Sequence, residues 1–275
     1  MPNRSFWKKH NKDLKYVEVV LRVGNARQTR YDGNIREGQE SEVMSNSVGV
    51  VIVAAGRGTR MGTTESKQYL LLQGKPILVH TLEVFQQHEL ISEIVLVTGE
   101  EDLERCREWI QVYKLGKVKA IVPGGTERQH SVYSGLIKLH TQWVMVHDGV
   151  RPFVQPSEIM ACYERAKEIG AAVLAVPVKD TIKQVDGGGK VLSTPDRRSL
   201  WAIQTPQTFR LSDLLEAYEA AERDGVLGTD DSSLAERVGI PVSVVEGSYR
   251  NIKITTPDDL DFAEFIVRNR GDEQS

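Results

Sequence analysis

The stretch VGVVIVAAGRGTRMG, residues 48–62, decides the fold of this chain. Its first seven residues are an apolar run, which predicts a strand buried on both faces. Small residues and glycines follow directly, and they allow backbone amides to approach a ligand closely. Because open α/β sheets bind ligands at the carboxyl ends of their strands, this loop is a candidate phosphate site.

The glycine spacing of this loop excludes two common nucleotide-binding motifs. The glycines read G-x-G-x-x-x-G, which differs from the G-x-G-x-x-G of dinucleotide folds, and the chain contains no G-x-x-x-x-G-K-[ST]. Three cations lie near the loop, namely Arg57, Arg60 and Lys67. Several cations around one loop suit a triphosphate, whose charge grows during transfer. A plain glycine turn with solvated basic residues is the alternative.

Apolar runs and helical patterns alternate through the rest of the chain. Further strands are expected at residues 94–98, 118–122, 143–146, 171–176, 242–246 and 251–255. Helices are expected at residues 77–87, 101–112, 127–139, 157–169, 212–223 and 232–238, and a last helix opens at Thr256-Pro257. Apolar strands separated by helices predict a parallel sheet covered on both faces.

Residues 181–193 interrupt this alternation. The segments TIKQV and KVLS flank the turn DGGG, which predicts a β-hairpin, and its strands read as polar. A hairpin of this kind cannot bury a face by itself, so we expect it to project as an arm.

Composition limits the classes of partner. The chain has 275 residues, a net charge of −3 and 40% hydrophobic residues, which is typical of a soluble globular protein. Neither a nucleic-acid nor a membrane partner is indicated, and we expect a cytoplasmic location. Cys106 and Cys162 form no metal-ligand pattern and are expected to be buried. Residues 1–47 are predicted to be a poorly ordered extension, with a short partner-binding segment as the alternative.

Asp148 follows the strand predicted at residues 143–146, within the sequence HDGVRP. A carboxylate at a strand end, facing the crevice of the glycine loop, can hold Mg²⁺ together with substrate phosphates. Arg151 could contact a phosphate, and we expect His147 to pack beside the site. The alternative for Asp148 is a turn cap.

A second glycine segment, PGGTERQHS at residues 123–131, follows the strand at 118–122. Its two glycines free the backbone to read the edge of a base. Arg128 and Ser131 fall on consecutive turns of the next helix, on one side. Taken singly, Arg197 and Lys253 would be read as surface charges.

Six motifs in order resemble one family. They are A-A-G-x-G-x-R-M with a later K-Q-Y-L, G-G-x-x-R-x-x-S-V, V-H-D-x-x-R-P, D-T-I-K, L-W-x-x-Q-T-P-Q and N-I-K-I-T. From about residue 48 to 267 the chain is similar to the methylerythritol phosphate cytidylyltransferases of the non-mevalonate isoprenoid pathway. Arg250 stands where some members carry an acidic residue.

The resemblance implies a fold and a reaction. The fold would be a three-layer α/β/α, Rossmann-like nucleotide-diphospho-sugar transferase fold over residues 48–275, with a dimerisation arm at about 180–196. The chain would transfer CMP from CTP to 2-C-methyl-D-erythritol 4-phosphate with Mg²⁺, as a homodimer with shared active sites, releasing pyrophosphate.

The resemblance also implies roles for individual residues. The catalytic set would be Arg60, Lys67 and Lys253, the last also facing the acceptor. Asp148 would bind the metal. CTP would be bound by Ala54, Ala55, Gly56, Gly58, Gly125, Arg128 and Ser131. The acceptor would be bound by Arg151, Thr181, Arg197 and Thr205, with Thr181 and Arg197 supplied across the dimer.

Other functions remain as alternatives. Ribitol 5-phosphate cytidylyltransferases share the nucleotide motifs, and Arg197 with the Leu200-Trp201 pair favours methylerythritol phosphate. A non-catalytic nucleotide-binding regulator on the same fold would be expected to lack Arg60, Lys67 or Asp148, and all three are present. The glycine spacing disfavours a dehydrogenase.

Overall fold

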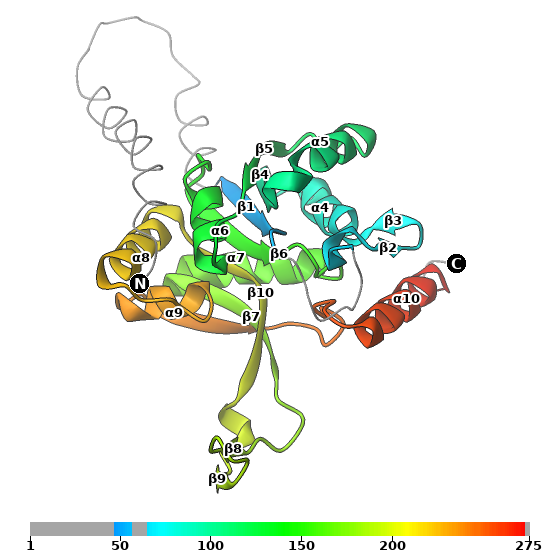
Figure 1. The fold of residues 1–275 in the computed structure, drawn as a ribbon. Helices are drawn as coiled ribbons and strands as arrows, with labels where there is room; N and C mark the ends of the chain where they lie inside the picture. Colours follow the sequence, from blue (N-terminus) through cyan, green and yellow to red (C-terminus); the bar gives the residue numbers. More distant parts are fainter. Residues whose placement is uncertain (1–46, 57–64, 273–275) are drawn as a thin grey trace, which may run out of the picture. The chain divides into compact units, whose positions relative to one another are not determined.

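A seven-stranded sheet forms the centre of the computed structural model, which describes residues 47–56 and 65–272 (Figure 1). Its strand order is β11-β7-β10-β6-β1-β4-β5. The strands are β1 (Val48–Val53), β4 (Ile91–Thr98), β5 (Val118–Pro123), β6 (Trp143–Asp148), β7 (Ala171–Pro177), β10 (Trp201–Arg210) and β11 (Val242–Glu246). Every neighbouring pair without β10 is parallel. The predicted extension up to residue 46, with Gly58 and Arg60, lies outside the described residues.

Strand β10 is the antiparallel member of a sheet that is otherwise parallel, as predicted. It pairs antiparallel with both β6 and β7, and the sequence patterns did not reveal it. Its register with β7 shifts between Ile203 and Gln207, where the Thr205–Pro206 peptide bond is cis. Because proline cannot donate a ladder hydrogen bond, it interrupts the pattern that marks a strand.

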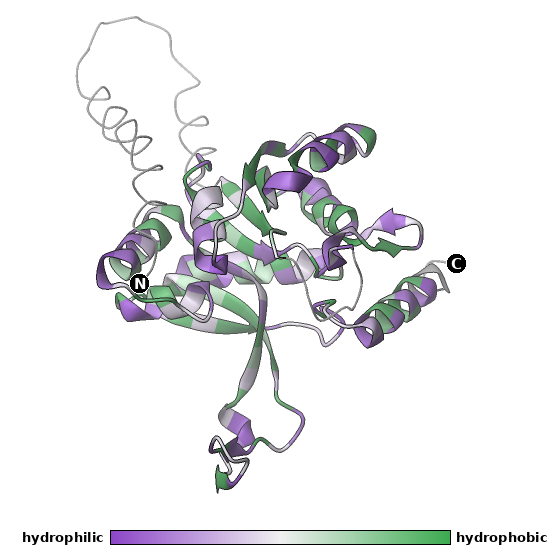
Figure 2. Ribbon diagram, in the orientation of Figure 1, coloured by the Kyte–Doolittle hydropathy of each residue, from purple (hydrophilic) through white to green (hydrophobic). Residues whose placement is uncertain are grey.

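Helices cover both faces of the sheet, as predicted. Val48, Val50 and Ile52 of β1 pack into one apolar core with residues of α4 (Ile77–Gln87), α5 (Leu103–Val112) and α7 (Pro156–Ile169). On the opposite face, α6 (Arg128–Leu136) lies against β1 and beside α8 (Leu211–Asp224), which contacts α9 (Asp231–Arg237). Figure 2 shows the apolar strands between helices whose outer sides are hydrophilic. The architecture is therefore a three-layer α/β/α sandwich.

The prediction of a strand at residues 251–255 is wrong. Asn251 is fully buried, and its side-chain amide donates to Gln204 Oε1 and to the carbonyl oxygen of Thr205. Its own carbonyl accepts a hydrogen bond from Arg151 Nη1 at 2.8 Å. Because side chains use the hydrogen-bonding groups that a ladder would need, the segment runs as an irregular connection.

The last helix, α10 (Pro257–Asp272), starts where its capping signal predicted. Thr256 Oγ1 accepts a hydrogen bond from the backbone of Asp259. Ala263 and Ile266 of α10 share a small apolar cluster with Leu72 and Ile254. Leu72 belongs to a short hairpin of β2 (Leu71–Leu72) and β3 (Lys75–Pro76), so α10 closes this end of the domain.

The predicted arm projects from the body of the domain (Figure 1). It carries β8 (Gln184–Val185) and β9 (Val191–Ser193), followed by a 3-10 turn at Arg197–Ser199. The expectation that its strands are polar is wrong. Three residues of β8 and β9 are apolar, Val185, Val191 and Leu192, and all three are more than half exposed.

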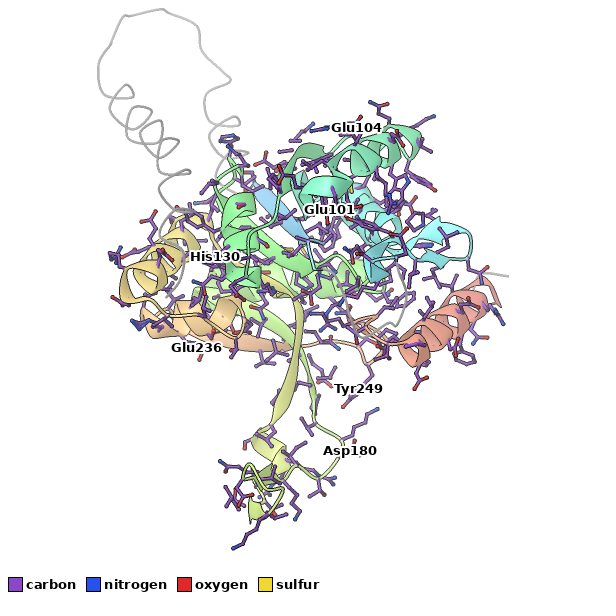
Figure 3. All side chains as sticks on the ribbon, viewed as in Figure 1. Glu101, Glu104, His130, Asp180, Glu236 and Tyr249 are labelled. Atoms are coloured by element: carbon purple, nitrogen blue, oxygen red, sulfur yellow. The ribbon has the colours of Figure 1, made fainter. Side chains whose placement is uncertain are left out.

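Tyr249 lies where the arm leaves the body, and Asp180 lies further along it (Figure 3). The phenol of Tyr249 donates to the carbonyl oxygen of Pro177 at 2.6 Å, and Lys179 Nζ lies 3.4 Å from the centre of its ring. In the parts of the chain that the structure describes, no helix combines the length and apolarity needed to cross a membrane.

Candidate active site

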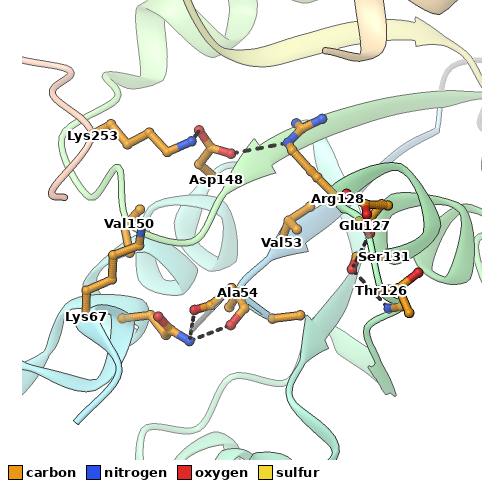
Figure 4. Close-up of a pocket in the computed structure, with 14 residues that line it drawn as sticks. Val53, Ala54, Lys67, Thr126, Glu127, Arg128, Ser131, Asp148, Val150 and Lys253 are labelled. Carbon is orange, nitrogen blue, oxygen red and sulfur yellow. Dashed lines mark hydrogen bonds and ion pairs between the residues drawn. The ribbon is translucent and has the colours of Figure 1, made fainter. Parts of the chain in front are cut away.

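A cavity of about 390 Å³ opens at the carboxyl ends of β1, β5 and β6 (Figure 4). The chain continues from β1 toward β4 and β5 on one side, and β6 lies on the other side of β1. Such a reversal of strand order is where open α/β sheets bind their ligands. Of the residues predicted for the site, the cavity is lined by Ala54, Ala55, Gly56, Lys67, Gly125, Arg128, Ser131, Asp148 and Lys253.

The sheet register places the two central motifs side by side. Val53 of β1 is paired with Asp148 of β6, and the amide of Gly149 donates to the carbonyl oxygen of Val53 at 2.9 Å. The glycine loop and the carboxylate therefore meet at one point of the sheet edge, as the sequence predicted.

Gln68 positions the first part of the glycine loop, and sequence reasoning gave it no role. Its side-chain amide donates to the carbonyl oxygen of Ala54 at 2.7 Å and to that of Gly56 at 3.2 Å. Gly124 allows the second glycine segment to approach, because a Cβ there would lie 2.3 Å from the Cβ of Ala55. The one signal in the sequence that could have indicated Gln68 is its place in the K-Q-Y-L motif.

Ser131 fixes the second glycine segment. Its hydroxyl accepts a hydrogen bond from the amide of Gly125 and donates to the carbonyl oxygen of Glu127, both at 3.1 Å. The backbone of this segment is thereby held against the cavity before any ligand arrives.

Three cations surround the carboxylate of Asp148. Lys253 Nζ lies 3.0 Å from Oδ2, Arg151 Nε lies 3.3 Å from Oδ2, and Arg128 Nε lies 3.8 Å from Oδ1. Burial alone would raise the pKa of Asp148, but the charges of Lys253, Arg128 and Arg151 outweigh it and hold the pKa well below its usual range. The group is therefore an ionised carboxylate throughout the physiological range of pH.

Arg128 is held by a second aspartate that sequence reasoning missed. Its Nη1 and Nη2 donate to the two oxygens of Asp231 at 3.0 and 2.7 Å, and Tyr218 also donates to Asp231. Asp231 is completely buried at the start of α9. More than a hundred residues separate the two partners, and no local pattern links them. The bidentate pair fixes the guanidinium so that Nε faces Asp148.

Arg151 and Thr205, both predicted to bind the acceptor, do not line the cavity but lie beside it. Arg151 is anchored to the carbonyl oxygen of Asn251, as described above. Thr205 is buried, and its Oγ1 accepts a hydrogen bond from the amide of Asp148 at 3.1 Å. His147 packs under the site, as expected, and burial lowers its pKa to about 4.

Thr181 and Arg197 are not brought to the cavity of their own chain. Both are exposed on the arm, where Arg197 Nη1 donates to the carbonyl oxygen of Lys179 at 2.8 Å. Among the described residues, no group of three or more His, Cys, Asp or Glu side chains could hold a metal. Asp148, which was predicted to bind the metal, lines the cavity.

A cavity at the strand-order reversal, lined by the start of the glycine loop, by cations and by the ionised carboxylate of Asp148, is the site expected of a nucleotidyltransferase. The family model for 2-C-methyl-D-erythritol 4-phosphate cytidylyltransferase matches residues 48–269, and the chain belongs to this family. A relative of that description from Bacillus velezensis is 52% identical over 221 residues, which is 80% of this chain and 95% of the relative. One from Geobacillus kaustophilus is 50% identical, covering 80% of this chain and 96% of the relative.

Solved structures share the fold. The 4-diphosphocytidyl-2C-methyl-D-erythritol synthase from Anaerococcus prevotii superimposes with a TM-score of 0.72 at 32% identity, covering 83% of this chain and 99% of that one. The 2-C-methyl-D-erythritol 4-phosphate cytidylyltransferase from Thermus thermophilus gives a TM-score of 0.66 at 32% identity, covering 81% and 99%. The predicted fold class is thus confirmed.

Proposed function

We propose that this chain transfers CMP from CTP to 2-C-methyl-D-erythritol 4-phosphate, giving 4-diphosphocytidyl-2-C-methyl-D-erythritol and pyrophosphate. The observation that carries the proposal is the cavity that joins the glycine loop, the segment Gly125–Ser131, Asp148 and two lysines in one place. Family membership identifies the two substrates, since relatives at about half identity bear that name.

The residues of the cavity suit the attack of one phosphate on another. The acceptor phosphate is largely ionised at pH 7, because its second pKa is about 6. No base is needed, and the main obstacle is repulsion between two anions. Lys67 and Lys253 line the cavity and supply positive charge for the α-phosphate and the departing pyrophosphate. We assign the same task to Arg60.

Asp148 fits a divalent cation shared with CTP. It is an ionised carboxylate in the cavity, and Mg²⁺ is commonly held by one or two carboxylates plus substrate phosphates. A bound Mg²⁺ would neutralise phosphate charge. The chain would contribute the fixed carboxylate of Asp148 to such a site, and Lys253, whose Nζ lies 3.0 Å from it, would supply a positive charge beside the phosphates.

The second glycine segment is the proposed reader of the cytosine base. Gly125, Thr126 and Glu127 all line the cavity, and Ser131 holds their backbone in place. Fixed amide and carbonyl groups can hydrogen-bond to the edge of one base and leave those of another unpaired, which is the strongest form of discrimination.

The acceptor side of the site is proposed to come from two chains. The arm exposes Val185, Val191 and Leu192, and Trp201 and Ile203 are exposed on β10. Apolar groups on a projecting hairpin need a partner surface, and a second copy of this chain supplies one. Thr181 and Arg197 would then reach the acceptor phosphate in the site of that second copy.

A pyrophosphate-release assay tests the proposal. The protein with Mg²⁺, CTP and 2-C-methyl-D-erythritol 4-phosphate should release pyrophosphate, and release should fall when UTP or ATP replaces CTP. Ribitol 5-phosphate serves as the competing acceptor, and omission of Mg²⁺ tests the metal. Faster release with ribitol 5-phosphate would reassign the acceptor, and no release with either acceptor would refute the activity.

A further inference from the structure

His147 is a fully buried imidazole whose two ring nitrogens both have partners. Its Nε2 lies 3.0 Å from the carbonyl oxygen of Arg151, and its Nδ1 lies 3.1 Å from Thr205 Oγ1. The ring meets Phe85 edge-on, with centroids 4.8 Å apart. It therefore connects β6, the turn that follows β6, and β10.

The partners of His147 determine its tautomer. A carbonyl oxygen can only accept, so Nε2 must carry a proton to bond to Arg151. The hydroxyl of Thr205 is buried, and among the described residues Nδ1 of His147 is the one acceptor within hydrogen-bond distance of its proton. Nδ1 is therefore an acceptor, and the hydroxyl of Thr205 must donate its proton to it.

This assignment constrains what Thr205 can offer a substrate. Its oxygen already accepts the amide hydrogen of Asp148 at 3.1 Å. Its single proton is directed to His147, so the hydroxyl has none left to give to a phosphate. Family resemblance implies that Thr205 binds the acceptor, and a hydrogen bond donated by its hydroxyl to the acceptor phosphate does not fit these contacts.

We propose that His147 and Thr205 are positioning residues, which hold the turn between Asp148 and Arg151 in place for the reaction. The turn has its own bond, from the amide of Arg151 to the carbonyl oxygen of Asp148 at 3.1 Å. His147 holds its far end through the carbonyl of Arg151, and Thr205 holds its near end through the amide of Asp148. The hydrogen-bonded ring is closed by the contact between Thr205 and His147.

This ring of hydrogen bonds determines the direction of two charged side chains at once. Asp148 and Arg151 contact each other through Oδ2 and Nε, and both leave the same turn. A shift of the turn would move the proposed metal ligand and the neighbouring guanidinium at once. This consequence rests on the proposed function, whereas the hydrogen-bond assignment does not.

Nuclear magnetic resonance of the imidazole nitrogens tests the assignment directly. A long-range ¹H–¹⁵N spectrum of the full chain should show a histidine with Nε2 protonated and Nδ1 bare, which is absent from the His147→Asn variant. In Thr205→Val, the Nδ1 signal should move toward that of an unbonded acceptor, and in Thr205→Ser it should stay. A protonated Nδ1 in the wild type, or no movement in Thr205→Val, would overturn the proposal.

Binding and kinetics test the positioning role. CTP with Mg²⁺, titrated by calorimetry without acceptor, should bind on the order of ten-fold more weakly to Thr205→Val, because the amide of Asp148 and Nδ1 lose buried partners. Thr205→Ser should stay within about three-fold of wild type. His147→Asn combined with Thr205→Val should weaken binding little more than the worse single variant does, because the two residues act as one unit.

An increase confined to the KM of the acceptor in Thr205→Val would contradict the proposal and make Thr205 a direct ligand. If the protein proved inactive toward 2-C-methyl-D-erythritol 4-phosphate, the spectra would still decide the hydrogen-bond assignment.

Discussion

Substitution of Lys67 is the simplest test of whether the site stabilises the charge that develops on the phosphates during the reaction. It lines the cavity next to the glycine loop. We expect Lys67→Ala to lower kcat by about 10²–10³-fold and to change the KM for CTP far less. The reason is that the lysine stabilises charge that grows in the transition state, and the loss of such stabilisation lowers kcat. Arg60→Ala should behave in the same way. Steady-state kinetics with varied CTP measure both, and Lys119→Ala, an exposed lysine on β5, is the control. An effect on KM alone would assign both residues to ground-state binding.

Asp231 provides a second residue-scale prediction. Asp231→Asn removes the charge partner of Arg128, and since the Arg128 side chain is 33% exposed, the cost should fall below the roughly 3–5 kcal/mol of a fully buried pair. We expect a clear loss of free energy of unfolding and a higher KM for CTP, because Arg128 loses its fixed direction. Denaturant unfolding and kinetics measure the two effects.

The matched control for Asp231 is Asp224→Asn. Asp224 pairs with Arg237 at the exposed end of α8, and an exposed ion pair contributes at most about 1 kcal/mol. Equal destabilisation by the two substitutions would show that the pair of Arg128 and Asp231 has no special weight.

At the scale of elements, the extension before the domain is expected to be dispensable. Residues 1–43 are rich in polar and charged residues, and the family match begins at residue 48. A chain that starts at Met44 should keep its kcat, its KM values and its Tm within experimental error. Kinetics and calorimetry of the two chains side by side check this. A drop of Tm by several degrees would mean that the extension packs against the domain.

Elements with regular apolar patterns could be predicted, and those held by side-chain hydrogen bonds could not. The helix at Ile77–Gln87 was predicted to the residue, because its apolar face and flanking turns are local signals. Strand β10 gives no strand pattern because Pro206 interrupts it. Residues 251–255 look like a strand in the sequence because nothing local reveals the bonds that Asn251 makes to Gln204 and Thr205.

The candidate site follows the same division. The glycine loop and Asp148 were predictable, because each directly follows an apolar strand. Gln68 and Asp231 were not, since their roles depend on partners brought close only by the completed sheet and its helices. The prediction that Cys106 and Cys162 are buried is confirmed.

At the scale of the whole molecule, the proposed dimer makes each active site a product of two chains. Lys67 and Asp148 line the cavity of one chain, whereas Arg197 is exposed on the arm. Mixing inactive Lys67→Ala and Arg197→Ala proteins should therefore restore activity. Random pairing makes half of the dimers mixed, each with one intact site, so recovery should approach about a quarter of wild type. Native mass spectrometry verifies exchange of subunits, and exchange without recovery would place Arg197 in its own site.

Strand β10 has a consequence for how the domain holds together. Within the described residues it alone hydrogen-bonds to both β6 and β7, so it joins the half of the sheet containing β1, β4, β5 and β6 to the half containing β7 and β11. Its pairing with β7 closes only the loop of the arm, and its pairing with β6 spans about sixty residues, whereas the pairing of β1 with β6 and that of β7 with β11 each close a longer loop. Opening of the pairing between β10 and β6 should therefore expose the amides of both strands to hydrogen exchange together, because this pairing holds the two halves of the sheet side by side. Because the same pairing also brings Thr205 to Asp148, the geometry of the active site depends on the strand that joins the two halves of the sheet.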